Sequence, residues 1–172
     1  MKFVAKTSIK KGNMDLKVTF LNSKNYDLKK SREIKYIIIH YTGMKNQLLA
    51  IQRLQSKVAK VSCHYLISRK GKIYQLVKDQ NIAWHAGKSR WEKDVNLNSK
   101  SIGIELVNKG NEPFPNKQIN VLLKLLAILM KKHKIHSKYV LGHEDIAPKR
   151  KKDPGPKFPW FRLYNGKLSK KR

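Results

Sequence analysis

The sequence has one cysteine, few acidic residues and no long apolar run. The single cysteine, Cys63, excludes an intrachain disulfide and is typical of a reducing compartment. No apolar run approaches the ~20 residues that a membrane-spanning helix needs, so we expect no transmembrane segment. The basic segment 1–11 also lacks the apolar core of roughly 7–15 residues that marks a secretory signal.

The shortage of acidic residues leaves a large positive charge. Thirty-nine Lys and Arg stand against 11 Asp and Glu, which gives a formal net charge of +28. Such a charge suits a nucleic-acid binder, but it is also what a lysine-rich proteome produces. The basic residues are scattered along the chain and are not interleaved with aromatic residues, so we expect no specific nucleic-acid partner. The same electric field would attract any other polyanion, including cell-wall polymers.

The residues that are present predict a single α/β domain. A chain of 172 residues, 40% of them hydrophobic, is long enough for one buried core. Strand-like and helical segments alternate along it, which favours one layered domain. The expected strands are 18–21, 36–40, 61–67, 72–77, 101–107 and 139–141, the expected helices are 45–60 and 116–133, and the expected loops are 22–32, 82–91 and 147–159.

Periodicity within these segments predicts which side chains face the core. In 36–40, strand alternation places Ile38 and His40 on the same side of the sheet. In 101–107 it places Glu105 on the side opposite the apolar isoleucines. For the helix 45–60, the residues expected on its apolar side are Leu48, Leu49, Ile51, Leu54 and Val58.

Two histidines and one aspartate at the ends of predicted strands or in a proline-rich loop suggest a metal site. His40 closes one strand, His143 follows another, and Asp153 lies in the loop 147–159. Two imidazoles and a carboxylate suit a catalytic zinc with a fourth position open for water. Taken singly, His40 fits a hydrogen-bonded core histidine and Asp153 fits a cap of the proline turn, so both alternatives stay open.

Glu105 is unusual because it interrupts a buried strand. An unpaired carboxylate is costly to bury, so it needs either a basic partner or a chemical role. Next to a metal and its water, a carboxylate can act as general base. Lys151, two residues before Asp153, would place a cation where an oxyanion develops, although it is one lysine among many. His133 and His136, at a basic helix end, are expected at the surface.

Seven sequence blocks in a fixed order resemble one enzyme family. The blocks are YIIIHYT (36–42), VSCHYLISRKG (61–71), IYQLV (73–77), AWHAG (83–87), SIGIEL (101–106), GHEDIAP (142–148) and RKKDPGP (150–156), and the resemblance as a whole runs from about Asn25 to Leu163. In this order they closely resemble the zinc-dependent N-acetylmuramoyl-L-alanine amidases of the amidase-2 family. The similarity is to its AmpD- and AmiD-like members, which are related to phage lysozyme-type amidases and to peptidoglycan recognition proteins.

The resemblance implies a fold and a set of site residues. It implies a single α/β domain in which a central mixed β-sheet is flanked by α-helices, with zinc in a groove above the sheet. The implied zinc ligands are His40, His143 and Asp153. Glu105 would activate water, and Lys151 would stabilise the tetrahedral intermediate.

The same resemblance implies residues that bind substrate. Trp84 would offer an apolar face to the sugar, and Lys60 would meet a carboxylate of the stem peptide. His64 and His85 match recurring family histidines that line or support the groove. Phage members carry tyrosine where this chain has Cys63, so no tyrosine role is transferred.

The resemblance also implies an activity and a context. The expected activity is hydrolysis of the amide bond between the lactyl group of N-acetylmuramic acid and L-alanine, in peptidoglycan or in (1,6-anhydro)muropeptides, with one Zn²⁺ ion. A family member that binds peptidoglycan without cutting it is the alternative. We expect a monomer with a basic N-terminal extension (1–24), the amidase domain (25–164) and a basic C-terminal tail (165–172). As the chain stands we expect the cytoplasm; the envelope or periplasm is the alternative if a signal was removed.

Overall fold

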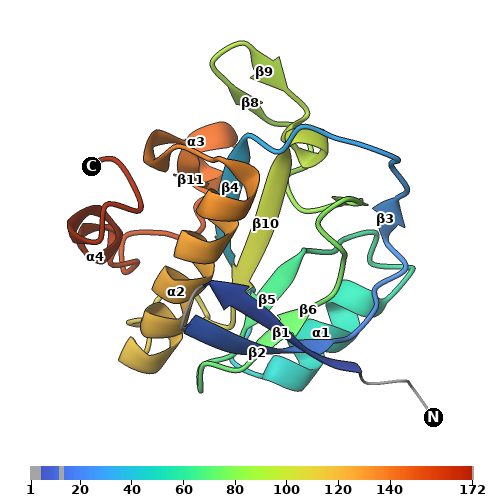
Figure 1. The fold of residues 1–172 in the computed structure, drawn as a ribbon. Helices are drawn as coiled ribbons and strands as arrows, with labels where there is room; N and C mark the ends of the chain where they lie inside the picture. Colours follow the sequence, from blue (N-terminus) through green and yellow to red (C-terminus); the bar gives the residue numbers. More distant parts are fainter. Residues whose placement is uncertain (1–4, 12–13, 172) are drawn as a thin grey trace.

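A seven-stranded mixed sheet forms the centre of the computed structural model, which describes residues 5–11 and 14–171. Its strands are β1 (Ala5–Lys11), β2 (Met14–Phe20), β4 (Tyr36–Tyr41), β5 (Tyr65–Ile67), β6 (Ile73–Gln75), β10 (Ser101–Leu106) and β11 (Val140–Gly142). They lie in the order β1-β2-β6-β5-β10-β4-β11 (Figure 1). The four consecutive strands β5, β10, β4 and β11 are parallel, whereas β5 and β6 are antiparallel. The predicted mixed sheet is confirmed.

Helices and short strand pairs complete the fold. The helices are α1 (Gln47–Gln55), α2 (Asn116–His133), α3 (His143–Ile146) and α4 (Trp160–Asn165), with 3₁₀ turns η1 (Leu97–Lys100) and η2 (Ser137–Tyr139). The short strand pairs are β3 (Tyr26–Asp27) with β7 (Ile82–Ala83), and β8 (Arg90–Trp91) with β9 (Asp94–Val95).

Strand alternation divides the side chains of β4 and β10 between two faces. On one face the isoleucines Ile37, Ile39 and Ile104 pack in the main core with α2, whose buried residues include Leu122 and Leu126. The opposite face carries Ile38, which packs in a second core cluster with α3 and η1. His40 and Glu105 share this second face, because alternate residues of a strand point the same way. The sequence prediction for both strands is confirmed.

Helix α1 is shorter than predicted, and only Ile51 and Leu54 of its predicted apolar residues are buried. It begins after Asn46, whose side chain accepts hydrogen bonds from two main-chain N–H groups of the first turn. The helix buries Ala50, Ile51 and Leu54 against the sheet. Leu48 and Leu49 face solvent, and Val58 lies beyond the helix end and is 91% exposed. The prediction that Leu48, Leu49 and Val58 belong to the apolar side is therefore wrong.

Part of the predicted N-terminal extension belongs to the main sheet. Strand β2 pairs with β6, and its Leu16 and Val18 are buried in the core. The alternation of apolar and polar residues around Leu16 and Val18 covers only a few positions, so the sequence predicts a strand only weakly there. The domain boundaries stay a prediction, and residues 1–4, 12–13 and 172 lie outside the described residues. At the other end, Leu168 packs on the core within the predicted tail.

Asp79 forms a buried polar cluster that joins the end of α2 to the sheet. Its carboxylate accepts hydrogen bonds from Tyr65 Oη at 2.6 Å, Lys132 Nζ at 2.7 Å and His133 Nε2 at 2.9 Å. Burial would raise the pKa of Asp79, but these bonds outweigh it and hold the pKa below its ordinary value. His133 is thus half-buried and bonded, and its prediction as a surface residue is wrong; His136 is exposed as expected.

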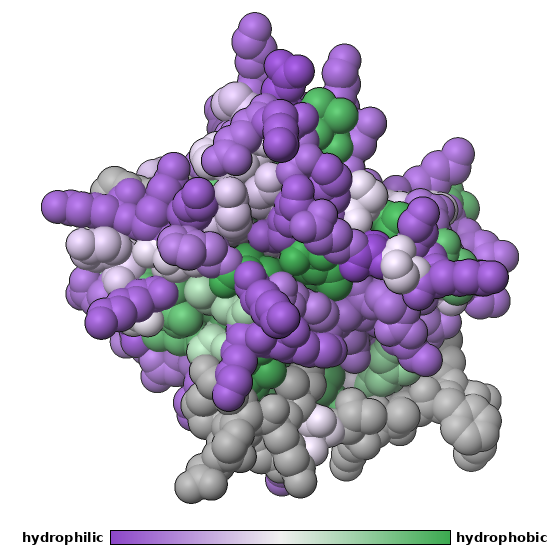
Figure 2. Space-filling view, turned by 45° about the horizontal axis from the view of Figure 1, so that its top comes forward, coloured by the Kyte–Doolittle hydropathy of each residue, from purple (hydrophilic) through white to green (hydrophobic). Residues whose placement is uncertain are grey.

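The face of the molecule that Figure 2 shows is mainly hydrophilic where its residues are described. Figure 2 shows polar and charged side chains over most of the visible face, with smaller apolar areas between them. No helix in the described part of the chain has both the length and the apolar character required to cross a bilayer.

Candidate metal centre

The register of two parallel strands brings His40 next to Glu105. His40 in β4 is paired with Glu105 in β10. Neighbouring strands are about 4.8 Å apart, and paired residues of a parallel ladder project to the same face. The two side chains therefore stand side by side near the carboxyl ends of their strands, which is where open α/β sheets place their ligands.

His143 and Asp153 complete a cluster with His40. His143 begins α3 directly after β11, and the loop that carries Asp153 is fixed by a hydrogen bond from Glu144 N to Asp153 O of 2.8 Å. His40 Nδ1 lies 3.0 Å from His143 Nδ1 and 2.9 Å from Asp153 Oδ2. His143 Nδ1 lies 3.1 Å from the same oxygen. All three residues are buried.

This triangle of atoms fits a zinc ion. One ligand atom from each residue lies within 4.8 Å of the other two. A tetrahedral zinc with ligand bonds of roughly 2.0–2.1 Å separates its ligand atoms by roughly 3.3 Å, close to the spacing of these atoms. Three potential ligand atoms at such short separations, in a buried place, need a cation or a shared proton between them. The nitrogen–nitrogen–oxygen donor set is one that zinc accepts, with one position left for solvent.

The protonation of the cluster suits metal binding. Burial lowers the pKa of His40 to about 4, so its ring is neutral at pH 7. Burial would raise the pKa of Asp153, but the neighbouring imidazoles of His143 and His40 outweigh this effect and hold the pKa below its ordinary value. His143 Nε2 donates to the carbonyl of Ala86 at 3.0 Å, so the other ring nitrogen, Nδ1, is the one that faces His40 and Asp153.

Glu105 has the environment of a general base. Its Oε2 atom is buried and has no hydrogen-bond partner among the described residues. Burial, followed by the negative charge of Asp153, raises the pKa of Glu105 to about 8, while the charge of Lys151 acts in the opposite direction. Glu105 opens onto a small recess of about 50 Å³ that Thr42 and Arg53 also line. This carboxyl group therefore combines access to a recess with a pKa near neutrality.

Two of the other predicted site residues lie at the surface and two lie inside. Lys60 is exposed and precedes Val61, which lines the recess beside Glu105. Trp84 is half-buried, and its main-chain N–H donates to Ser62 Oγ at 2.8 Å, which holds it beside the same segment. His64 and His85 are 0% and 6% exposed, so their burial favours support of the groove over direct lining.

Residues that sequence reasoning missed hold His85 in place. The main-chain N–H groups of His85 and Ala86 both donate to Asn98 Oδ1, at 3.0 and 2.7 Å. Gly103 lies under the imidazole, and a Cβ atom there would come within 2.4 Å of His85 Cγ. The signal in the sequence was the glycine between two isoleucines of a buried strand, where a side chain would normally be expected.

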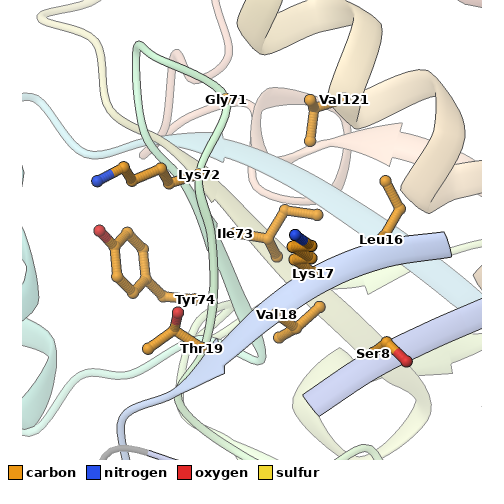
Figure 3. A pocket seen from close by; sticks show the side chains of 10 residues that line it. All are labelled: Ser8, Leu16, Lys17, Val18, Thr19, Gly71, Lys72, Ile73, Tyr74 and Val121. Carbon is orange, nitrogen blue, oxygen red and sulfur yellow. The ribbon is translucent and has the colours of Figure 1, made fainter. Parts of the chain in front are cut away.

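A separate groove lies away from this cluster. It has a volume of about 810 Å³ and lies between β2, β6 and α2. Figure 3 shows Leu16, Ile73 and Val121 on its apolar side and Lys72 and Tyr74 on the other. None of the predicted site residues lines it, so it is not the candidate site.

The fold and the cluster together define an α/β protein with a candidate metal centre and a neighbouring carboxylate at the ends of parallel strands. Residues 30–156 match the Amidase_2 family, described as N-acetylmuramoyl-L-alanine amidase. The chain belongs to this family.

Individual relatives agree with this assignment. N-acetylmuramoyl-L-alanine amidase AmiD of Escherichia coli is 40% identical over 148 residues, covering 76% of this chain and 52% of that protein. 1,6-Anhydro-N-acetylmuramyl-L-alanine amidase AmpD of Haemophilus influenzae is 43% identical over 104 residues, covering 60% of this chain and 56% of that protein. The chain thus spans about half the length of these relatives.

A solved structure shares the fold. It is the complex of E. coli AmiD with anhydro-N-acetylmuramic acid-L-Ala-D-gamma-Glu-L-Lys, with a TM-score of 0.76 and 35% identity. The match covers 95% of this chain and 66% of that one. The predicted family and fold class are therefore confirmed.

Proposed function

We propose that this chain hydrolyses the amide bond between the lactyl group of N-acetylmuramic acid and L-alanine, in peptidoglycan or in (1,6-anhydro)muropeptides. The observation that carries the proposal is the convergence of His40 Nδ1, His143 Nδ1 and Asp153 Oδ2 beside the carboxyl group of Glu105. Because all four residues come from one chain, a monomer is sufficient for the reaction.

His40, His143 and Asp153 would hold one zinc ion. Bound there, zinc would supply Lewis acidity, which makes a water molecule easier to deprotonate and polarises the scissile carbonyl. The buried position of the three ligands supports the assignment, because desolvation strengthens the attraction between a cation and a carboxylate.

Glu105 would move the protons in this reaction. Its carboxylate takes a proton from the attacking water and then gives it to the leaving amine nitrogen of L-alanine. The partly buried Lys151 would stabilise the negative charge that develops on the carbonyl oxygen. Its proximity is supported by the effect of its charge on the pKa values of both Glu105 and His40.

The substrate class is supported by the relatives and by the charge of this chain. The solved AmiD structure is a complex with an anhydro-N-acetylmuramyl tripeptide as substrate, and the name of AmpD specifies a 1,6-anhydro substrate. Stem peptides carry carboxylates, which a protein with a net charge of +28 attracts. Arg53, which lines the recess beside Glu105, the exposed Lys60, which precedes the lining residue Val61, and the half-buried Trp84 are the proposed contacts for the peptide and the sugar.

A hydrolysis assay with two substrates tests the proposal. The full chain is incubated with purified sacculi and with anhydromuropeptides, with and without a chelator, and the products are identified by mass. We expect free stem peptide together with the peptide-free sugar, loss of both after chelation, and recovery after zinc is added. Binding to sacculi without any cleavage by the zinc-loaded protein would instead indicate a recognition module and overturn the proposal.

A further inference from the structure

A chain of hydrogen bonds leads from the main chain to the ring nitrogen of His40 that faces away from the proposed metal. Ser101 Oγ lies 2.6 Å from the carbonyl oxygen of Leu97 and 3.2 Å from His85 Nε2. His85 Nδ1 in turn lies 3.1 Å from His40 Nε2. The other nitrogen of His40, Nδ1, faces Asp153. The proposed metal ligand is thus the last member of a chain that begins at a main-chain carbonyl.

The direction of every bond follows from the first one. A carbonyl oxygen only accepts, so the single hydroxyl proton of Ser101 is donated to Leu97. Ser101 Oγ is then an acceptor for His85, which places the His85 proton on Nε2. A neutral imidazole carries one proton, so His85 Nδ1 accepts from His40 Nε2–H. The lone pair of His40 is consequently on Nδ1.

The opposite direction would close the metal site. If His85 carried its proton on Nδ1, it would donate to His40 Nε2, and the proton of His40 would move to Nδ1. There it would be donated to Asp153 Oδ2, 2.9 Å away, and would occupy the position of a metal ion. Both arrangements contain the same number of protons. Asp153 would accept a proton in the second arrangement, whereas the hydroxyl group of Ser101 favours the first.

We propose that Ser101 and His85 are positioning residues that hold His40 as the Nε2–H tautomer and so prepare its Nδ1 atom for a metal ion. The inference rests on the metal site of the proposed function but not on the proposed substrate. It gives His85 a specific task and assigns a role to a serine outside the predicted site.

Burial makes the chain of bonds effective. Ser101, His85 and His40 are 0%, 6% and 1% exposed, so competing hydrogen bonds to bulk water are largely excluded. The absence of a side chain at Gly103 lets the ring of His85 lie directly on the strand. The side chain of Asn98 accepts a hydrogen bond from the main-chain N–H of His85 at 3.0 Å. The position of the His85 ring is thereby set by the fold before any ion binds.

The test compares Ser101→Ala with Ser23→Ala in the full chain. Ser23 is a matched control, because it is also 0% exposed and also donates to a main-chain carbonyl, that of Leu54, at 2.6 Å, but it does not contact the cluster. Long-range ¹H–¹⁵N spectra of the metal-free protein report which imidazole nitrogen carries the proton. Zinc affinity is measured by competition with a chromophoric chelator.

We expect Nε2–H signals for His40 and His85 in the wild type and in Ser23→Ala. In Ser101→Ala we expect a population with the proton on Nδ1 and a zinc dissociation constant raised by roughly tenfold or more, the range found for groups that orient metal ligands. Ser101→Thr, which keeps the hydroxyl group, is expected to restore both the Nε2–H tautomers and the zinc affinity of the wild type. An Nδ1–H signal from His40 in the wild type would overturn the inference, and so would unchanged zinc affinity in Ser101→Ala.

These results separate the inference from the proposed function. A protein that binds zinc with the expected serine dependence but leaves muropeptides intact would refute the proposed activity and retain the inference. The wild-type spectrum tests the tautomer of His40 even if Ser101→Ala does not fold.

Discussion

Replacement of Glu105 by glutamine separates the chemical role of this residue from its effect on stability. Glutamine keeps the size of the side chain and removes its capacity to take a proton. General-base catalysis contributes about 100- to 10,000-fold to rates, so Glu105→Gln is expected to lower the turnover of a muropeptide by such a factor. Zinc affinity should stay within a few-fold of the wild type, because Glu105 is not among the three proposed ligands.

The same substitution should stabilise the metal-free protein at neutral pH. The pKa of Glu105 rises from 4.5 to about 8 in the folded state, mainly because of burial. Because the pKa is raised on folding, ionisation of Glu105 does not destabilise the folded protein below the pKa of the unfolded chain. The destabilisation grows as the pH rises from about 4.5 to about 8. At pH 7 the penalty reaches at most about 3 kcal/mol at 1.36 kcal/mol per pKa unit, and solvent access to the partly exposed residue reduces it.

Two measurements check this prediction. Turnover of anhydromuropeptide is compared between zinc-loaded wild type and Glu105→Gln, and urea unfolding of both metal-free proteins is followed from pH 4 to pH 8. The stability difference in favour of the variant should be near zero at the acid end and increase with pH. Turnover within tenfold of the wild type would refute the assignment of the base. A stability difference independent of pH would refute the role of burial.

Three further substitutions test neighbouring parts of the structure. Gly103→Ala should destabilise the protein by about 1–3 kcal/mol and weaken zinc binding, because the new Cβ would displace His85; unchanged zinc affinity would contradict this. Lys151→Met should lower turnover by about 100- to 1000-fold with zinc retained, as seen by metal analysis. Asp79→Asn should cost about 1.5–3 kcal/mol at pH 7 in urea unfolding. Because the pKa of Asp79 is lowered on folding, this difference should shrink as the pH falls below about 4, and a constant difference would count against the buried cluster.

The elements that the sequence predicted well are those with a complete local signal. The segment 36–40 and the segment 101–107 are apolar, β-branched runs, and both form buried strands of the central sheet. Helix α2 begins at Asn116 and ends at His133, as its apolar periodicity predicts. In these segments hydrophobic burial and local preference favour the same structure, so neighbouring residues alone were sufficient to predict it.

Elements with an incomplete local signal were predicted less well. Strand β2 has only short apolar alternation, and its pairing with β6 provides the rest of its stability. On α1, Ile51 and Leu54 are buried as the spacing predicts, but contact with the sheet selects Ala50 in place of Leu48 and Leu49. His133 was expected at the surface because it lies in a run of basic residues; its partner Asp79 is far away in sequence. Such contacts depend on distant residues, which periodicity does not describe.

The sequence by itself determined the residue types of the candidate site and, through the order of its motifs, the family. It could not determine that His40 and His143, 103 positions apart, come within 3.0 Å of each other. That approach results from the parallel pairing of β4 with β11, and the register of β4 with β10 places Glu105 beside them. The direction of the hydrogen bonds that orient His40 was likewise decided by tertiary structure, because it depends on which buried groups can only accept a proton.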